Sequence, residues 1–346
     1  MDNPSVLRQK DPSGGLKIIA DQYQQALFDA KIWNEDHDDR EITSVVVVGM
    51  GGSALAADIA KVWLKHDLRI PFEVVRGYSL PSYVGRNTLV IASSYSGNTE
   101  ETISALDMAE HCQSQLAIIA SSGKLMDIAA GYDIAHVNLP DGIPQRMTVI
   151  CNLRAILAIL QNFDVIHNDQ LDEIEKLSGW LGRESATWAP DIPTIENYAK
   201  QLAESAVGKT AVFYGGELTA PLAYKWKISW NENAKNVAFA SAYPEANHNE
   251  FLGWTSHPIE KPFAVFDLVS RFENPKILRR FELSDRMLSG KRPAATTIDL
   301  EGKTPIAQLL WGSILADFVS VYLGILNGVD PVSVELINKF KKELKD

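Results

Sequence analysis

Apolar residues in this chain form short uninterrupted runs that alternate with segments of helical spacing. The run SVVVVG, from Ser44, has no polar position after its first residue, which is typical of a strand buried on both faces of a parallel sheet. A helix is expected after it, through about Leu64, and another over residues 97–111. The strands expected in this half of the chain are residues 44–49, 72–77, 88–94, 115–121 and 133–139. Alternating strands and helices predict a doubly wound α/β sheet.

The same alternation begins again in the second half of the chain. Residues 152–203 have a helical pattern that breaks near 188–194. Beyond them, strands are expected at 210–216, 237–243, 262–270 and 295–300, and helices at 222–235, about 305–326 and about 331 to the end. A chain of 346 residues exceeds what one hydrophobic core usually supports, so we expect two domains, residues 1–153 and 154–346. Each is predicted to be a doubly wound subdomain, with a mainly parallel sheet flanked by helices.

Composition narrows the functional classes. The formal net charge of −11 argues against a general nucleic-acid binder, which needs a basic face. The two cysteines, Cys112 and Cys151, cannot supply a disulfide framework or a thiolate metal site. We find no apolar run that approaches ~20 residues and no signal-like segment behind Met1, so neither a membrane span nor export is expected. The simplest expectation is a cytoplasmic protein with reduced thiols.

A glycine-rich turn, GMGGS from Gly49, joins the first of these strands to its helix. Glycine lets the backbone approach a ligand closely, and the N–H groups at a helix start favour phosphate. The dinucleotide fingerprint would require glycine at position 54, where Ala54 stands, and no Walker lysine follows. The turn therefore indicates either a phosphate site at Gly51, Gly52 and Ser53 or a tight turn without a ligand.

A second motif, SSYSGNTEET from Ser93, follows the next buried strand of the central sheet. Ser94, Ser96 and Thr99 place hydroxyl donors where a helix begins, and glutamates suit its first turn. Simple helix capping needs one such residue, and three hydroxyls within six residues exceed that need. Both motifs follow the carboxyl ends of parallel strands, where open α/β sheets bind ligands. The pair therefore predicts a phosphate site without a cationic side chain.

Together, GMGGSA and SSYSGNTEET resemble the sugar isomerase domain, which holds phosphorylated sugars. The later motifs WNENAK and EANHNEFLGW resemble the bifunctional phosphoglucose/phosphomannose isomerases of archaea and bacteria, and the resemblance covers nearly the whole chain. It implies an aldose–ketose isomerase that converts glucose 6-phosphate and mannose 6-phosphate to fructose 6-phosphate through a cis-enediolate. A role in carbohydrate metabolism, in glycolysis or gluconeogenesis, is the corresponding expectation.

Two side chains are candidates for proton transfer and charge stabilisation between C1 and C2. Glu232, in WNENAK, matches the family's proton-transfer glutamate, and partial burial beside Trp226 and Trp230 would raise its pKa. The alternative for Glu232 is an ordinary solvent-facing glutamate on a helix. Arg146, in DGIPQRMTV, lies after the last strand of the first domain and by resemblance steadies the enediolate. The alternative for Arg146 is a surface arginine.

A histidine is the candidate for opening the sugar ring, which needs an acid at the ring oxygen. His248, in EANHNE, has Glu245 and Glu250 close by in sequence, and these acids could hold a ring nitrogen and set its tautomer. An ordinary loop histidine is the alternative for His248. His257 is its rival, but TSHPIEKP reads as a connection and His257 is expected to be structural.

The final helix, VELINKFKKEL, carries a lysine that also matches the family's pattern. Lys341 follows the apolar Phe340, as the family's lysine follows an apolar residue, and Lys339 is the alternative. A solvated basic helix end, favoured by the macrodipole, would explain either lysine equally well. The segment DPVSVE departs from the threonine-proline that commonly follows this Asp-Pro in the family, so no epimer preference is predicted.

The expected protein is thus a hexose 6-phosphate isomerase that needs no cofactor and no metal. Phosphate is assigned to the first domain, because Glu217 in YGGELTA would repel it from the matching turn of the second. By analogy with the wider family we expect a homodimer with its active site between subunits, the histidine coming from the partner. Two alternatives stay open: an amino-sugar phosphate isomerase or phosphosugar lyase, and a phosphosugar-sensing regulator without catalysis.

Overall fold

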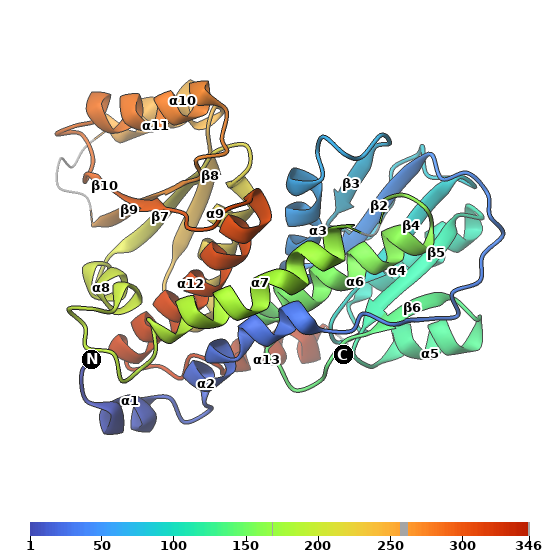
Figure 1. Ribbon diagram of the computed structural model, residues 1–346, viewed down its shortest axis with the longest axis horizontal. Helices are drawn as coiled ribbons and strands as arrows, with labels where there is room; N and C mark the ends of the chain where they lie inside the picture. Colours follow the sequence, from blue (N-terminus) through green and yellow to red (C-terminus); the bar gives the residue numbers. More distant parts are fainter. Residues whose placement is uncertain (168, 257–261, 345–346) are drawn as a thin grey trace. The chain divides into compact units, whose positions relative to one another are not determined.

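The computed structural model describes residues 1–167, 169–256 and 262–344, and it divides the chain into two compact units (Figure 1). Residues Gln22–Trp180 form one unit, which we call the six-stranded unit. Residues Met1–Asp21 and Leu181–Asp346 form the other, the four-stranded unit. The predicted fold class is confirmed: each unit has a mainly parallel sheet flanked by helices.

The sheet of the six-stranded unit has the order β1-β6-β5-β4-β2-β3. All neighbouring strands are parallel except β1, which pairs antiparallel with β6. The strands are β1 (Ile32–Trp33), β2 (Ser44–Gly49), β3 (Phe72–Val75), β4 (Thr88–Ser93), β5 (Gln115–Ala120) and β6 (Ala135–Asn138). Because β2 and β4 lie side by side while their connections lead in opposite directions, the topological switch point falls between them.

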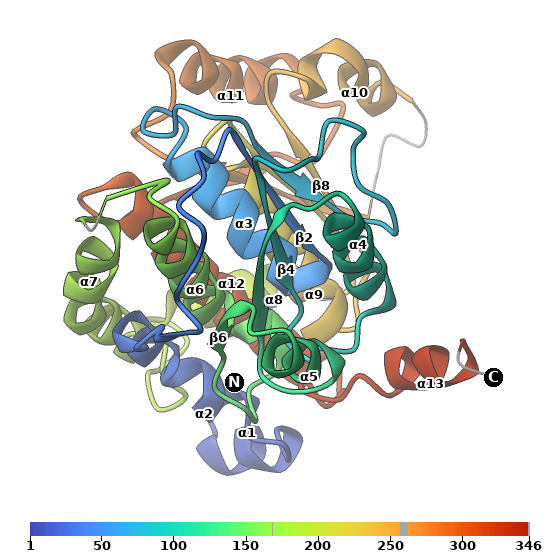
Figure 2. The same cartoon turned by 90° about the vertical axis from the view of Figure 1, so that its right-hand side faces the viewer.

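Helices cover both faces of this sheet. Figure 2 shows α4 to one side of β2 and β4 and α6 to the other. The β2 and β4 strands are buried along their whole length, which is why they read as continuous apolar runs. The helical elements of this part of the chain are η1 (Gln22–Leu27), α3 (Gly51–Trp63), α4 (Glu100–His111), α5 (Lys124–Gly131), η2 (Gln145–Met147), α6 (Val149–Asn162) and α7 (Asp169–Ala186).

The sheet of the four-stranded unit is wholly parallel, in the order β10-β9-β7-β8. Its strands are β7 (Thr210–Gly215), β8 (Ala238–Ala242), β9 (Phe263–Val269) and β10 (Ala295–Asp299). The helices are α1 (Pro4–Lys10), α2 (Gly15–Ala20), α8 (Tyr198–Ser205), α9 (Ala220–Asn233), α10 (Ala246–Trp254), α11 (Pro275–Met287), α12 (Pro305–Leu326) and α13 (Glu335–Glu343).

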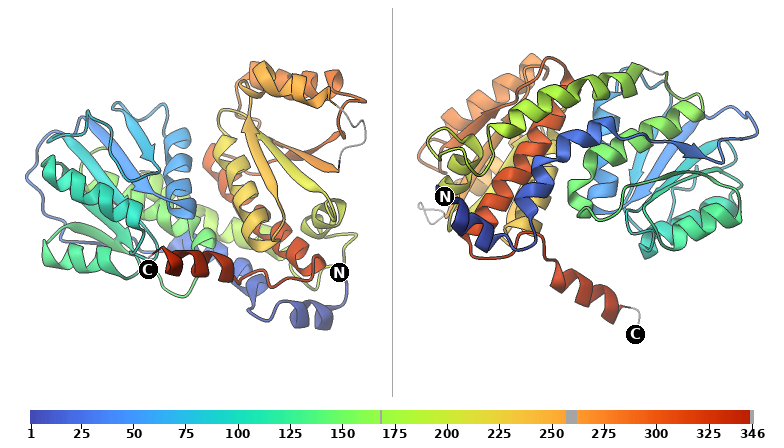
Figure 3. Two further views of the ribbon diagram at one scale, coloured as in Figure 1. Left: turned by 180° about the vertical axis from the view of Figure 1, so that it is seen from behind. Right: turned by 60° about the horizontal axis from the view of Figure 1, so that its bottom comes forward.

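The long helix α12 is the core of this unit. Every residue from Ile306 to Ile325 is buried, and α12 packs against α8, α9 and α2, as Figure 3 shows for α2 in its right-hand view. Two buried polar links join α12 to α9: Lys225 Nζ and Ser229 Oγ both donate to Asp317 Oδ1, at 2.7 and 2.8 Å. The expectation that no apolar run approaches the length of a membrane span is wrong for this helix, which is long and apolar enough. Its most apolar stretch is 94% buried inside the protein, as in a core helix.

The structure also differs from the expected element boundaries. The boundary predicted at residues 153 and 154 falls inside α6, which packs on α3, β5 and β6, whereas the compact six-stranded unit runs to Trp180. No helix is expected from the sequence where α10 and α11 lie, and no strand is expected where β1 lies. The last helix is expected to begin near residue 331, but α13 starts four residues later. A two-residue strand such as β1 is too short to carry a periodic signal.

Candidate active site

The glycine-rich turn lies at the carboxyl end of β2, beside the switch point. No side chain caps the first turn of α3, whose N-cap position is Met50. A Cβ atom at Gly52 would lie 2.8 Å from the carbonyl oxygen of Gln145, so only glycine lets the α3 start pack against η2. The helix start therefore packs directly against the segment that carries Arg146, while its backbone N–H groups are left without a side-chain cap.

The serine-rich loop lies at the carboxyl end of β4, the strand next to β2. Ser94 is buried, and its Oγ pairs with Thr99 Oγ1 at 2.8 Å. Thr99 is the N-cap residue of α4, yet its side chain makes no capping hydrogen bond to that helix. Gly97 has a φ of +64°, and a Cβ there would lie 1.7 Å from the carbonyl oxygen of Ser122. The Ser94 and Thr99 hydroxyls thus bond to each other and do not cap the helix, while Ser96 Oγ accepts from the Asn98 N–H at 3.4 Å.

Tyr95 and Gln145, which were not among the predicted site residues, connect these loops by hydrogen bonds. Ser53 Oγ accepts hydrogen bonds from the Tyr95 N–H (3.3 Å) and from Gln145 Nε2 (3.4 Å). The Tyr95 hydroxyl donates to Pro140 O (2.9 Å) and accepts from the Ile143 N–H (3.0 Å). Tyr95 lies between Ser94 and Ser96 in the sequence, and Gln145 directly precedes Arg146. Their position beside predicted site residues is the only feature of the sequence that could have indicated them.

Arg146 lies in η2 and is 4% exposed, so the surface alternative for this residue is wrong. The loop that carries it follows β6 and is held to the serine-rich loop by Tyr95 and to Ser53 by Gln145. The six-stranded unit thus gathers Gly51, Gly52, Ser53, Ser94, Ser96, Thr99 and Arg146 at the carboxyl edge of one sheet. Hydroxyls, a guanidinium and uncapped N–H groups at one edge suit a phosphorylated, oxygen-rich ligand.

The matching turn of the four-stranded unit is occupied by a carboxylate from its own chain. Glu273, 5% exposed, accepts hydrogen bonds at Oε1 from the N–H groups of Leu218 (2.9 Å) and Thr219 (3.0 Å) and from Thr219 Oγ1 (3.2 Å). Burial raises the pKa of Glu273, against the lowering effect of these donors. Glu217, which was expected to exclude phosphate here, is exposed, and the carboxylate that occupies the donors is Glu273.

Glu232 lies in the last turn of α9. It is half-buried, while its neighbours Trp226 and Trp230 are fully buried, so the helix turns its aromatic face to the core. The Glu232 carbonyl oxygen accepts a hydrogen bond from Lys235 Nζ (2.8 Å), which also donates to Asp330 O (2.6 Å). The end of α9 is thereby fixed to the segment that leads to α13.

His248 lies in α10 and is exposed. The expectation that a nearby acid holds its ring is not met. Glu245 Oε1 accepts from Asn249 Nδ2 (2.9 Å), and Glu250 Oε2 accepts from the Tyr214 hydroxyl (2.6 Å). Both carboxylates are engaged elsewhere, because residues on different faces of one helix turn cannot all point to the same ring. His257, the rival histidine, lies outside the described residues.

Glu232 and His248 lie at opposite ends of the four-stranded sheet. Asn231, beside Glu232, accepts a hydrogen bond from the N–H of Ala238, the first residue of β8 (3.0 Å). His248 belongs to α10, which begins only after the last residue of β8, Ala242, beyond the far end of the strands (Figure 1). A five-residue strand rises roughly 15 Å. Within one unit the two residues therefore lie near opposite ends of β8, about a strand length apart.

The two candidate lysines lie on α13. No residue of this helix is buried, and neither Lys339 nor Lys341 pairs with a side chain in the described part of the chain. The choice between Lys341 and Lys339 therefore stays a prediction. In the same described ranges, no group of three or more His, Cys, Asp or Glu side chains is placed to hold a metal ion.

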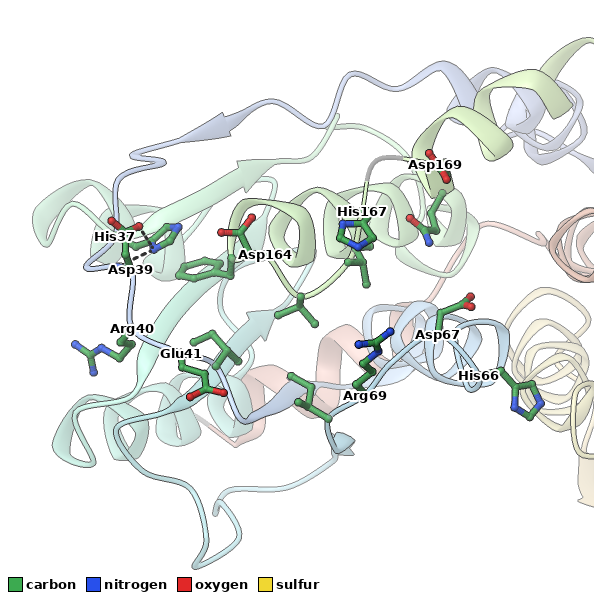
Figure 4. A pocket seen from close by; sticks show the side chains of 16 residues that line it. His37, Asp39, Arg40, Glu41, His66, Asp67, Arg69, Asp164, His167 and Asp169 are labelled. Atoms are coloured by element: carbon green, nitrogen blue, oxygen red, sulfur yellow. Dashed lines mark hydrogen bonds and ion pairs between the residues drawn. The ribbon is translucent and has the colours of Figure 1, made fainter.

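A cavity of about 810 Å³ lies in the six-stranded unit away from this edge (Figure 4). Arg40 precedes β2 and Arg69 follows α3, so the cavity opens at the amino end of the sheet. His37 and Arg40 in its wall already bond to main-chain carbonyls: His37 Nε2 to Asn162 O at 2.8 Å, and Arg40 Nη1 to Gln113 O at 2.9 Å. The predicted site residues are not among those that line it, and we assign it no function.

Comparison with known proteins agrees with this geometry. Residues 40–136 match the SIS domain, and residues 195–344 match the C-terminal SIS domain of bacterial phosphoglucose isomerase. The bifunctional phosphoglucose/phosphomannose isomerase of Caldicellulosiruptor bescii is 31% identical over 336 residues, which are 95% of this chain and 97% of that protein. This chain belongs to the same family. The family member from Aquifex aeolicus is also 31% identical, over 302 residues that cover 87% of this chain and 90% of that protein.

Two further relatives widen the comparison beyond the bifunctional isomerase family. The D-glucosamine-6-phosphate 4-epimerase of Sulfolobus acidocaldarius is 31% identical over 239 residues, 65% of this chain and 71% of that protein. Among solved structures, the C-terminal domain of glucosamine-fructose-6-phosphate aminotransferase from Francisella tularensis has a TM-score of 0.68 at 14% identity, covering 95% of this chain and 98% of that one. The second likeness concerns the fold alone.

Proposed function

We propose that this chain is an isomerase that interconverts glucose 6-phosphate and mannose 6-phosphate with fructose 6-phosphate. One observation carries the proposal: in a chain of the bifunctional isomerase family, hydroxyl-bearing loops and a buried arginine gather at the topological switch point of the six-stranded sheet. Phosphate is held by Ser53, Ser94, Ser96 and Thr99 with the backbone of Gly51 and Gly52. The four-stranded unit cannot offer a second phosphate site at its matching turn, because Glu273 fills it.

The reaction has two stages, and each uses a different side chain. His248 gives a proton to the ring oxygen O5 as the C1–O5 bond breaks and the O1 hydroxyl proton passes to solvent water, which produces the open-chain aldehyde. Glu232 then takes the proton from C2 while the electron pair moves to O1, and Arg146 stabilises the resulting enediolate. The Glu232 carboxyl returns the proton to C1, and the O2 proton passes to O1. Since C2 of the enediolate has no stereocentre, one base serves both epimers.

We also propose a homodimer in which His248 acts on the partner's substrate. The separation of Glu232 and His248 by about the length of β8 supports this, because O5, C1 and C2 of one sugar are adjacent atoms. A single four-stranded unit does not bring both side chains to the same sugar. Lys341 is retained as a further candidate contact to the substrate, and the cytoplasm as the expected compartment.

Glu232→Gln tests the base. Turnover of glucose 6-phosphate, followed by coupled assay of fructose 6-phosphate, should fall by about a hundredfold or more, since a positioned base contributes that much. Isomerase activity that stays within about tenfold of wild type would show that another group is the base.

Complementation tests the shared site. Co-expressed Glu232→Gln and His248→Asn chains should regain about a quarter of the wild-type activity that neither homodimer has, because half of random pairs are mixed and each mixed pair holds one intact site. If a mixture that contains verified mixed dimers stays inactive, Glu232 and His248 of one chain act on the same substrate molecule.

The amino-sugar alternative has one observation in its favour, the 31% identity to a D-glucosamine-6-phosphate 4-epimerase. It covers less of the chain than the identity to the bifunctional isomerases. Parallel assays with glucosamine 6-phosphate and glucose 6-phosphate separate the two, and a preference for the amino sugar by kcat/KM would favour the alternative.

A further inference from the structure

Most anchors of α10, the helix that bears His248, lie on one face; the buried Ala246 and the Asn249–Glu245 hydrogen bond lie outside this set. Asn247, Glu250, Phe251 and Trp254 follow the spacing i, i+3, i+4, i+7 and therefore lie on one side of the helix. Asn247, Glu250 and Trp254 all make side-chain hydrogen bonds, and Phe251 packs in the hydrophobic core beside Trp254. His248 is one residue further round and is exposed. The direction of the His248 ring thus depends on how this anchored face fixes the rotation of α10.

Tyr214, near the end of β7, is the central anchor. It is 2% exposed, its hydroxyl donates to Glu250 Oε2 at 2.6 Å, and the same oxygen accepts from Trp254 Nε1 at 2.9 Å. Burial raises the pKa of Tyr214, with Glu250 adding to the effect, so the phenol keeps the proton that it donates. One hydroxyl thereby holds two turns of α10 against the sheet.

Two further contacts close this arrangement. The guanidinium of Arg292, 6% exposed, lies 5.5 Å from the Tyr214 ring centre and 5.9 Å from that of Trp254, within cation–π range of both. At the start of α10, Asn247 donates to Ser284 Oγ and accepts from Arg280 Nη1, both at 2.9 Å. Ser284 and Arg280 belong to α11, which lies beside α10 in Figures 1 and 2. The helix is held from the sheet and from its neighbour.

We propose that Tyr214 is a positioning residue for His248: through Glu250 and Trp254 it sets the rotation of α10 and so aims the imidazole at the sugar ring oxygen. This rests on the proposed role of His248 in ring opening. Loss of the hydroxyl leaves a buried Glu250 oxygen and a buried indole N–H without their partner, which allows α10 to turn or shift. A shift of about 1 Å at an acid costs up to a hundredfold in rate.

The test measures ring opening apart from isomerisation. Enzyme-catalysed exchange between the two anomers of glucose 6-phosphate, measured by NMR exchange spectroscopy, requires ring opening but no proton transfer between C1 and C2. Tyr214→Phe should slow anomer exchange and the isomerisation kcat by about tenfold to a hundredfold, with KM within about threefold because the phosphate loops are untouched. Glu232→Gln should keep anomer exchange and lose isomerisation, which separates the stages.

Tyr83→Phe is the matched control. The Tyr83 hydroxyl donates to Glu73 Oε2 at 2.5 Å in the six-stranded unit, so this variant removes a tyrosine–glutamate bond that has no link to α10. Both of its rates should stay within about twofold of wild type. Anomer exchange by Tyr214→Phe that is also within about twofold of wild type would overturn the proposal, whatever its thermal stability.

A second pair of variants distinguishes a loss of positioning from a loss of folding. Glu250→Gln keeps an oxygen that accepts from Tyr214, and Glu250→Ala does not. Anomer exchange should be several-fold faster in the glutamine variant, and equal rates would overturn the proposal. If His248→Asn abolishes anomer exchange while Tyr214→Phe does not, only the positioning role fails. If His248→Asn leaves the exchange unchanged, the assigned function of His248 fails and this proposal with it.

Discussion

The turns at Gly49 and Gly215 join a buried parallel strand to a helix in the same way, but their helices begin in different surroundings. At α3 no side chain caps the helix, and hydroxyls of the neighbouring loop lie nearby, with Tyr95 linking the loop to Ser53. Just before α9 a buried carboxylate, Glu273, accepts from the N–H groups of Leu218 and of the N-cap residue Thr219. We propose that the turn at Gly49 binds an anionic ligand, whereas the turn at Gly215 is filled by the chain itself.

The difference teaches that duplication of a fold does not duplicate its site. An anion at a helix start is stabilised whether it comes from a ligand or from the chain itself. In the four-stranded unit the internal carboxylate supplies an acceptor for the N–H groups of the turn. In the six-stranded unit no side chain caps α3, and the Ser94 and Thr99 hydroxyls bond to each other.

The largest expected effect concerns a second carboxylate buried in the four-stranded unit. Asp267, in β9, is 2% exposed, and burial raises its pKa to about 7 although Arg292 opposes this. Because the folded-state pKa lies above that of the unfolded chain, the folded state holds a proton that the unfolded chain releases, and stability falls as pH rises from about 4 to about 7. The difference in unfolding free energy between wild type and Asp267→Asn should fall by about 4 kcal/mol over this range, measured by urea denaturation.

Asp133→Asn serves as the control for this pH series, since Asp133 is an exposed residue of the six-stranded unit. Any change in its difference from wild type over this pH range should be well below that of Asp267→Asn. A flat difference for Asp267→Asn would mean that this unit does not bury a proton-holding carboxylate.

The second effect converts the open turn into a filled one. Ser96→Asp places a carboxylate in the half-buried serine-rich loop, where it should repel the phosphate and raise KM by about a hundredfold. Steady-state kinetics with fructose 6-phosphate measures this. Ser104→Asp, which adds the same charge further along α4, should leave KM within about threefold. Equal effects of the two variants would argue against phosphate binding at Ser96.

The third effect removes the internal acceptor from the filled turn. Glu273→Ala should lower the unfolding free energy by about 1–3 kcal/mol, because the N–H groups of Leu218 and Thr219 lose their acceptor. Glu217→Ala, at the exposed position just before Leu218, should change it by less than about 0.5 kcal/mol. A larger effect at Glu217 would reverse the assignment of the filling carboxylate.

The smallest effect distinguishes a side chain that binds the substrate from one that caps a helix. Thr99→Ala should cost less than about 0.5 kcal/mol of stability, because Thr99 does not cap α4, while KM rises several-fold. Asn197→Ala is the comparison: Asn197 caps α8 through the Lys200 N–H at 3.0 Å, and its loss should cost about 1 kcal/mol. Thermal unfolding and kinetics on both variants check this, and a Thr99 cost equal to that of Asn197 would indicate ordinary capping.

Much of the fold could be predicted from the chain because its central strands are buried on both faces. β2 and β4 have no polar interruption, and their bounds match the expected runs within a residue. Helix α10 escaped prediction because its anchors include asparagine and glutamate, and a partly polar inner face leaves little periodic hydrophobic signal. Helix α11 was missed although its buried residues Ile277, Phe281 and Ser284 follow helical spacing.

The candidate site, like the fold, could be predicted only in part from the sequence. Local motifs were enough to single out the two loops that we propose as the phosphate site, because glycine and hydroxyl spacing is a property of neighbouring residues. The sequence by itself determined the family, the two-sheet architecture and the residue types available for chemistry. Only the tertiary structure decided that Glu273 fills one turn, that Tyr95 and Gln145 join the loops of the other, and that Glu232 and His248 lie at opposite ends of a sheet. Those outcomes depend on contacts between residues tens of positions apart, whose geometry is set by packing and hydrogen-bond satisfaction and not by local pattern.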